Sequence, residues 1–222
     1  MILCLVTDRR RLGAAMGASR EEWPEILARQ VQAAATAGID YVQVREPDLE
    51  ARPLATLVRE LVRRTAGTPT RILVNDRIDV AIAAGASGVH LRETSVMPEQ
   101  ARRIAPPGFV ISCAVHSIAS AIARKSADLL IAGTVLSTAS KPSVDYLNKA
   151  GLETIVKAAA GQSVLGIGGL DLSSVPLVAA SSAAGMAAIG AFIPRADDDL
   201  SEFVQKCVRE LRLLFDSHNS RT

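Results

Sequence analysis

Hydroxyl groups and one lysine follow a short apolar run in the stretch 133–142, GTVLSTASKP. Thr138, Ser140 and Lys141 supply the side chains of this group. Hydroxyl and backbone N–H groups donate hydrogen bonds to phosphate oxygens, and a lysine ammonium adds a positive charge. The same composition also occurs in solvent-exposed turns. The stretch therefore indicates either an anion-binding loop or an ordinary turn, and the neighbouring motifs favour the loop.

Polar side chains also end other apolar runs of the chain. Gln43 and Arg45 end one run, and Asn75 and Asp76 follow another. A carboxylate that faces a polyphosphate is repelled by it unless a cation such as Mg²⁺ bridges the two groups, so Asp76 is a candidate metal ligand. Its alternative role is to cap the helix that we expect from residue 78 onwards.

Two histidines lie near the ends of apolar runs. His90 stands inside the run 88–91, where a packed and hydrogen-bonded histidine is the favoured interpretation. His116 precedes an expected helix, which Ser117 can cap. Because the ordinary pKa of histidine is near neutrality, His116 is a candidate for proton transfer, with a structural role as the alternative.

Glycines follow two further apolar runs. Gly168 and Gly169 come after the run 164–167, and Gly190 comes after the run 186–189. Glycine allows backbone N–H groups to approach an anion closely, so these positions predict a phosphate site. A plain tight turn is the alternative for the Gly168–Gly169 pair.

The elements that must position these residues alternate regularly along the chain. Short apolar runs predict strands at 2–6, 41–45, 72–74, 88–91, 109–113, 129–132, 164–167 and 186–189. Amphipathic patterns predict helices at 21–37, 54–64, 78–84, 98–104, 118–125, 152–159, 172–180 and 200–215. Eight such units favour a single (β/α)8 TIM barrel over residues 1–222. A doubly wound sheet is the alternative, but no G-x-G-x-x-G follows the first run.

Composition narrows the functional class. The 222 residues carry a net charge of +2, and the arginines at 9–11, 63–64 and 102–103 are scattered, which predicts a solvated surface and argues against nucleic-acid binding. The three cysteines predict buried free thiols of a reducing compartment, so we expect a cytoplasmic protein. We expect no membrane span and no signal peptide. The oligomeric state stays open between a monomer and a homodimer.

The chain resembles the thiamine phosphate synthase and thiazole tautomerase superfamily over nearly its whole length. The matching motifs are VTDR at 6–9, YVQVRE at 41–46, VNDRIDVAIAAGASGVHL at 74–91, VHS at 115–117, GTVLSTASKP at 133–142 and GIGG at 166–169. Each motif alone is weak, and their combination is specific. The resemblance implies a barrel enzyme that acts on small phosphorylated substrates.

The superfamily's synthase joins an aminopyrimidine diphosphate to a thiazole phosphate and releases pyrophosphate. By resemblance, the pyrimidine diphosphate is held by Gln43, Arg45 and Asn75, with Asp76 as a ligand of Mg²⁺. The pyrophosphate is bound by Thr138, Ser140 and Lys141, and the thiazole phosphate by Gly168, Gly169 and Gly190. The resemblance implies that the C–O bond breaks first, and that the metal ion and cationic groups stabilise the departing pyrophosphate.

Three positions depart from the superfamily pattern. Pro47 stands where the superfamily usually has a diphosphate-binding lysine, and Ser95 stands where it usually has a second aspartate ligand for the metal. Ala114 replaces a serine two residues before the histidine. The first two departures are expected to weaken binding of Mg²⁺ and diphosphate.

These departures keep two alternatives open. A thiazole tautomerase shifts protons on a thiazole carboxylate phosphate, with a histidine matching His116, and requires neither metal nor diphosphate. A non-catalytic binder of thiazole phosphate is the third interpretation. Retention of Asp76 and of the Thr-x-Ser-Lys loop favours the synthase.

Overall fold

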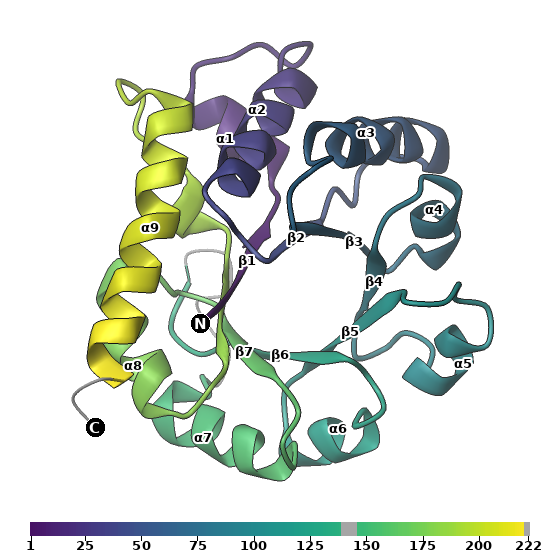
Figure 1. Ribbon diagram of the computed structural model, residues 1–222, viewed down its shortest axis with the longest axis vertical. Coiled ribbons are helices and arrows are strands. Elements are labelled where there is room, and N and C mark those ends of the chain that lie inside the picture. The colour runs from purple at the N-terminus through teal and green to yellow at the C-terminus, as the bar shows by residue number, and fades with distance from the viewer. Residues whose placement is uncertain (139–145, 220–222) are drawn as a thin grey trace.

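The computed structural model describes residues 1–138 and 146–219 and forms a closed barrel of parallel strands (Figure 1). Each strand pairs with the next in sequence, and the last pairs with the first. The strands are β1 (Ile2–Val6), β2 (Tyr41–Val44), β3 (Arg71–Asn75), β4 (Gly88–Leu91), β5 (Val110–Val115), β6 (Leu129–Gly133), β7 (Val164–Ile167) and β8 (Gly185–Ala188). The predicted (β/α)8 barrel is therefore confirmed.

Helices surround the barrel on its outside (Figure 1). They are α1 (Arg9–Ala15), α2 (Trp23–Thr36), α3 (Ala51–Arg64), α4 (Ile78–Ala83), α5 (Pro98–Arg102), α6 (Ile118–Ala123), α7 (Asn148–Ala158), α8 (Val175–Ala180) and α9 (Leu200–Asn219), with short 3₁₀ turns η1 (Leu172–Ser174) and η2 (Gly190–Phe192). The sequence did not predict α1. This helix is short, and its N-cap is Asp8, whose carboxylate accepts a hydrogen bond from the backbone N–H of Arg11.

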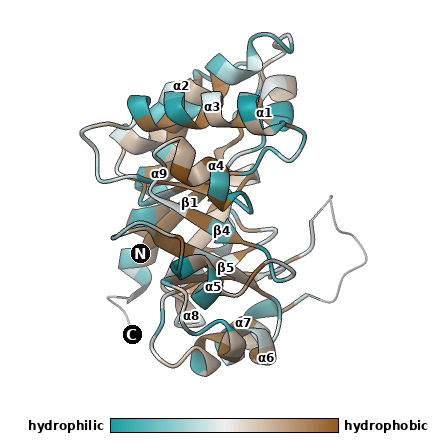
Figure 2. Ribbon diagram, turned by 90° about the vertical axis from the view of Figure 1, so that its right-hand side faces the viewer, coloured by the Kyte–Doolittle hydropathy of each residue, from teal (hydrophilic) through white to brown (hydrophobic). Residues whose placement is uncertain are grey.

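The side chains of each strand alternate between two apolar layers, as strand geometry requires. Along β1, Leu3 and Leu5 pack toward the helices. Cys4 and Val6 point the other way and pack inside the barrel in a cluster with Leu129, Ile131, Leu165 and Ala187. Figure 2 shows from the side that the strands are largely brown, whereas the helices mix teal and brown residues. The three cysteines are free and buried, as predicted.

Strand boundaries differ from the sequence prediction where it matters for the site. β3 extends to Asn75, and β5 runs from Val110 to Val115 instead of ending at residue 113. His116 therefore lies directly after β5, and Ser117 caps α6 by accepting from the backbone N–H of Ser120, as predicted. The prediction ended β3 at its last apolar residue, although the polar Asn75 still pairs with β4. It ended β5 too early, because Ala114 and Val115 also pair with β6.

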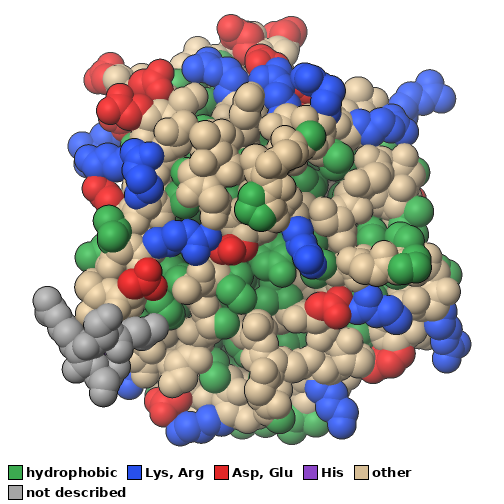
Figure 3. All heavy atoms as spheres, viewed as in Figure 1, with side chains coloured by type: hydrophobic (Ala, Val, Ile, Leu, Met, Phe, Trp, Pro, Cys, Tyr) green, Lys and Arg blue, Asp and Glu red, His purple; other side chains and the backbone are tan. Residues whose placement is uncertain are grey.

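Within the described ranges, no helix is both long enough and apolar enough to cross a bilayer. On the face seen in Figure 3, basic and acidic side chains are interspersed around the rim.

Candidate active site

Polar side chains gather inside the barrel near the carboxyl ends of four consecutive strands. Tyr41 packs against the interior cluster, so Gln43, two residues later on β2, shares the inward face. Gln43 Nε2 donates to Asn75 Oδ1 on β3 at 2.9 Å. Asn75 lies opposite His90 of β4 in the strand register, and His90 lies opposite Ser112 of β5. The sequence-predicted residues Gln43 and Asn75 are thus brought together.

Only one of the two polar atoms of the Gln43 amide is hydrogen-bonded. Its side chain is almost completely buried, and its Oε1 atom has no hydrogen-bond partner among the described residues. An unpaired buried acceptor is costly in a folded protein unless a ligand pairs with it. Gln43 therefore offers an acceptor for an N–H group of a bound molecule, next to the oxygen-bearing end of Asn75.

His90 is packed and hydrogen-bonded, as the sequence predicts. Its Nδ1 atom lies 3.0 Å from Ser112 Oγ, and burial lowers the pKa of the imidazole from 6.5 to about 4. The charge of Asp76 opposes this effect, whereas Arg45 and His116 add to it. His90 is thus neutral at physiological pH, and the three other groups lie close enough to sense its charge.

This shifted pKa predicts a pH-dependent stability. Below pH 6.5 the unfolded chain binds a proton that folded His90 accepts only near pH 4. The free energy of unfolding should therefore fall as the pH is lowered, by about 3 kcal/mol between pH 7 and pH 4. Urea denaturation of the wild type and of a His90→Gln variant measures this: the wild type should lose that much more than the variant. Parallel pH profiles would contradict the assignment.

Arg45 follows β2 and is held through its backbone. Its N–H donates to Thr7 Oγ1 at 2.9 Å, and the Thr7 hydroxyl donates to Glu46 Oε1 at 2.6 Å. Glu46 in turn accepts from the Arg9 guanidinium at 2.8 Å. The Arg45 side chain itself is exposed at the end of the strand. The backbone that carries this cation is therefore fixed by a buried polar network.

The same network corrects one prediction from the sequence. Residues 9–11 were expected to be solvated arginines, but Arg9 is buried and its guanidinium pairs with both Glu46 and Asp48, the latter at 2.5 Å. Pro47, which stands at the position of the expected lysine, lies between those two carboxylates. No sequence pattern revealed this network, because its partners are about forty residues apart in the chain.

The two glycine motifs lie on neighbouring strands, because β7 pairs with β8 at Ile167 and Ala187. Gly168 and Gly169 have φ angles of 102° and 68°, which a side chain rarely tolerates. A Cβ atom on Gly168 would lie 2.5 Å from Thr134 Cγ2, and one on Gly169 would lie 2.6 Å from the carbonyl oxygen of Ser137. The glycine pair thus packs against the loop after β6, and the two predicted anion-binding segments are adjacent.

An arginine that the sequence reasoning missed lies beside Gly190. The Arg11 Nη2 atom is 3.2 Å from the position that a Cβ atom on Gly190 would occupy. Arg11 belongs to α1, a helix that the apolar pattern did not predict. Its position adds a guanidinium to the glycine loop after β8, where a phosphate was expected.

His116 pairs with an acidic residue of the preceding loop. Its Nδ1 atom lies 2.7 Å from Glu93 Oε2, and both side chains are partly exposed. The backbone carbonyl of Glu93 accepts from the buried Arg124 at 2.6 Å, which fixes the loop. A histidine with one nitrogen on a carboxylate can exchange a proton through the other. Glu93 was not among the predicted residues.

Asp76 is engaged by the loop after β4. Its backbone has a φ of 60°, a left-handed conformation that aspartate tolerates better than most residues. Its Oδ2 atom accepts from Arg92 Nε at 2.6 Å, and its Oδ1 atom accepts from the Ser95 hydroxyl. The N-cap of α4 is Arg77, without a side-chain cap, so the helix-cap alternative for Asp76 is wrong.

The remaining predicted residues are in the loop after β6. Thr138 lies at the end of the described part of this loop and is partly buried. Ser140 and Lys141 lie outside the described residues, so their predicted roles stay predictions.

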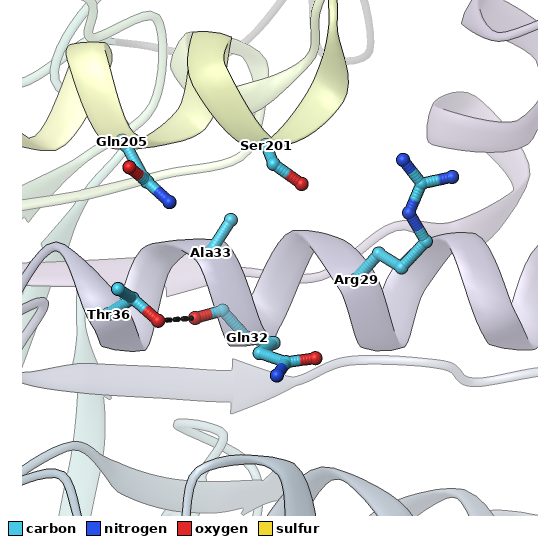
Figure 4. Close-up of a pocket in the computed structure, with 6 residues that line it drawn as sticks. All are labelled: Arg29, Gln32, Ala33, Thr36, Ser201 and Gln205. Carbon is cyan, nitrogen blue, oxygen red and sulfur yellow. Dashed lines mark hydrogen bonds between the residues drawn. The ribbon is translucent and has the colours of Figure 1, made fainter.

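Two cavities lie on the outside of the barrel. One of about 320 Å³ lies between α2 and α9, where Arg29, Gln32 and Thr36 face Ser201 and Gln205 (Figure 4). Thr36 Oγ1 donates there to the Gln32 carbonyl at 3.0 Å, a bond within the helix. A second, of about 660 Å³, is bordered by residues of α2 and α3 and by Arg9 of α1. Among the described residues, none of the predicted site residues lines either cavity.

Comparison of the sequence with known families gives one assignment. A family model described as thiamine monophosphate synthase matches residues 5–192. A thiamine-phosphate synthase from Methanoculleus marisnigri is 37% identical over 168 residues, which cover 74% of this chain and 79% of the relative. One from Pyrococcus abyssi is 32% identical over 216 residues, covering 96% and 94%.

Solved structures agree with the sequence comparison. A thiamine phosphate pyrophosphorylase from Pyrococcus furiosus superimposes with a TM-score of 0.77 at 27% identity and covers 98% of this chain and 96% of its own. A 3-hexulose-6-phosphate synthase from Salmonella typhimurium has a TM-score of 0.68 at 15% identity, covering 98% and 100%, which shows a shared barrel fold alone.

Proposed function

The chain belongs to the thiamine monophosphate synthase family, and on that premise we propose that it joins a hydroxymethylpyrimidine diphosphate to a thiazole phosphate and releases pyrophosphate. This makes it a transferase of thiamine biosynthesis. The observation that carries the proposal in the structure is the Gln43–Asn75 pair with its unpaired buried acceptor. An aminopyrimidine carries the N–H donors that Gln43 Oε1 lacks.

In this proposal the barrel mouth has two substrate regions. The Gln43–Asn75 pair orients the pyrimidine ring at the ends of β2 and β3. The glycine loops after β7 and β8 hold the thiazole phosphate, since Gly168, Gly169 and Gly190 leave backbone N–H groups open to an anion. Arg11 adds its charge beside Gly190. The two substrates then meet across the mouth.

The reaction begins with loss of the leaving group. The C–O bond between the pyrimidine methylene and the diphosphate breaks, and the electron pair leaves with the diphosphate. Fixed cations stabilise the developing negative charge, a role for Arg45 and, from the sequence, Lys141. The thiazole nitrogen then attacks the methylene carbon. Because His90 is neutral, it adds no positive charge to the barrel interior.

The residues around Asp76 fit a bound Mg²⁺ poorly. Mg²⁺ is held by oxygen ligands in near-octahedral geometry, often one or two carboxylates with substrate phosphates. Both oxygens of Asp76 are already engaged, one by Arg92 and one by Ser95. The described residues contain no cluster of three or more His, Cys, Asp or Glu side chains arranged for a metal ion.

The contact between His116 and Glu93 favours a second candidate, a thiazole tautomerase, which requires a positioned proton-transfer group. The two functions respond differently to His116→Ala. A synthase should retain most of its turnover, because its bond breaking depends on cations. A tautomerase should lose about 10²- to 10⁴-fold in rate. Assays of thiamine phosphate formation and of thiazole carboxylate phosphate isomerisation, each with both proteins, decide between them.

A further inference from the structure

Arg92 pairs with Asp76, the carboxylate that a metal ion would bind. It follows β4 directly, and its Nε and Nη2 atoms both contact Asp76 Oδ2. Ser95 holds the other oxygen of Asp76, and the Ser95 hydroxyl also accepts from the backbone N–H of Arg92 at 3.1 Å. The guanidinium is thus anchored by a carboxylate whose side chain is only 19% exposed.

The guanidinium of Arg92 keeps N–H donors that do not bind Asp76. The Arg92 side chain is 64% exposed, and its hydrogen bond and ion pair with Asp76 use Nε and Nη2 and leave Nη1 out. A guanidinium presents its N–H groups in a planar fork that matches phosphate oxygens. Because Asp76 holds one edge of this fork, the other edge is pre-oriented at the carboxyl ends of β3 and β4. Arg45, which also senses the charge of His90, lies at the same end of the barrel.

A divalent ion would have to displace this arrangement. Mg²⁺ on Asp76 would lie at contact distance from the guanidinium that already binds the same oxygen, and two like charges at such separations repel. Ser95 offers a neutral hydroxyl in place of a second carboxylate. The charge that the site can present to an anion therefore comes from the chain itself.

We propose that Arg92, anchored by Asp76 and Ser95, is the resident cation that binds the diphosphate of the substrate and the released pyrophosphate, so that this site works without a divalent metal ion. The inference rests on the proposed synthase function. It assigns Asp76 a positioning role: the carboxylate orients Arg92 and does not contact the substrate.

Binding of inorganic pyrophosphate to the full chain tests this, measured by calorimetry in EDTA and in excess Mg²⁺. The wild-type Kd should change by less than about threefold between the two buffers. Arg92→Gln should weaken binding at least about tenfold in EDTA, and Arg92→Lys should fall between them because it keeps the charge without the fork. The exposed Arg59 of α3 gives a matched control, and Arg59→Gln should bind as the wild type does.

A double variant, Arg92→Gln with Ser95→Asp, tests the exchange of cations. It frees Asp76 and adds a second carboxylate, so its pyrophosphate binding should recover only when Mg²⁺ is present. Wild-type binding that requires Mg²⁺, or unchanged binding by Arg92→Gln, would overturn the proposal. Melting temperatures of all variants identify any that fail to fold, and Arg92→Lys then carries the test.

Product assays in the two buffers distinguish a wrong role for Arg92 from a wrong synthase assignment. Formation of thiamine phosphate only with Mg²⁺ would leave the synthase intact and refute the role of Arg92. Absence of product in both buffers would refute the synthase, whereas the pyrophosphate titrations would still report on Arg92.

Discussion

Replacement of Arg45 by alanine is expected to lower the turnover number of the synthase reaction by about 10²- to 10³-fold. Loss of one preoriented group that stabilises charge in the transition state typically has an effect of this size. The backbone of Arg45 is fixed through Thr7 and Glu46, and its exposed side chain extends from the end of β2. Steady-state rates of pyrophosphate release measure the effect.

Arg59→Ala is the control for this variant, because Arg59 is an exposed arginine on α3. Both variants remove one surface guanidinium, so general charge effects are matched. Equal, small losses in the two variants would mean that Arg45 has no role in the reaction. A lowered melting temperature of Arg45→Ala alone would instead indicate that its side chain supports the fold.

Gly168→Ala is expected to reduce kcat/KM for thiazole phosphate by about a hundredfold. The added Cβ would lie 2.5 Å from Thr134 Cγ2, at a φ of 102° that alanine rarely adopts. The loop must shift to relieve both conflicts, and a displacement of about 1 Å in a substrate-positioning group can have an effect of this size. Saturation kinetics with each substrate in turn measure where the loss falls.

Gly67→Ala separates local geometry from general backbone strain. Gly67 also has a positive φ, 82°, but nothing lies within 4 Å of its Cβ position, and it precedes β3 at the opposite end of the barrel. Both variants should lose some stability. Only Gly168→Ala should lose catalytic efficiency, and a matching loss in Gly67→Ala would show that the glycine loop holds no substrate.

The barrel could be predicted from the sequence because alternation of short apolar runs with amphipathic helices is a local property. The same strand periodicity places Gln43 on the inward face, since it shares the parity of Tyr41. The glycine pair was recognisable for a similar reason: Gly168 and Gly169 follow a strand where the backbone must turn sharply.

The contacts of the charged residues could not be predicted in this way. Arg9 joins Glu46 and Asp48 across two strands, and Asp76 meets Arg92 from the next loop. These pairs depend on which strands are neighbours and on a left-handed φ at Asp76, neither of which a single sequence encodes as a pattern. Arg11 was missed because its helix is too short for a detectable apolar period.

The most direct test of the synthase assignment is product analysis. The purified chain is incubated with hydroxymethylpyrimidine diphosphate and thiazole phosphate, with EDTA in one reaction and Mg²⁺ in another, and thiamine phosphate and pyrophosphate are quantified by mass spectrometry and phosphate assay. We predict equimolar formation of the two products, and none when either substrate is omitted. Absence of thiamine phosphate in both reactions, from a folded protein that isomerises thiazole carboxylate phosphate or only binds thiazole phosphate, would contradict the assignment.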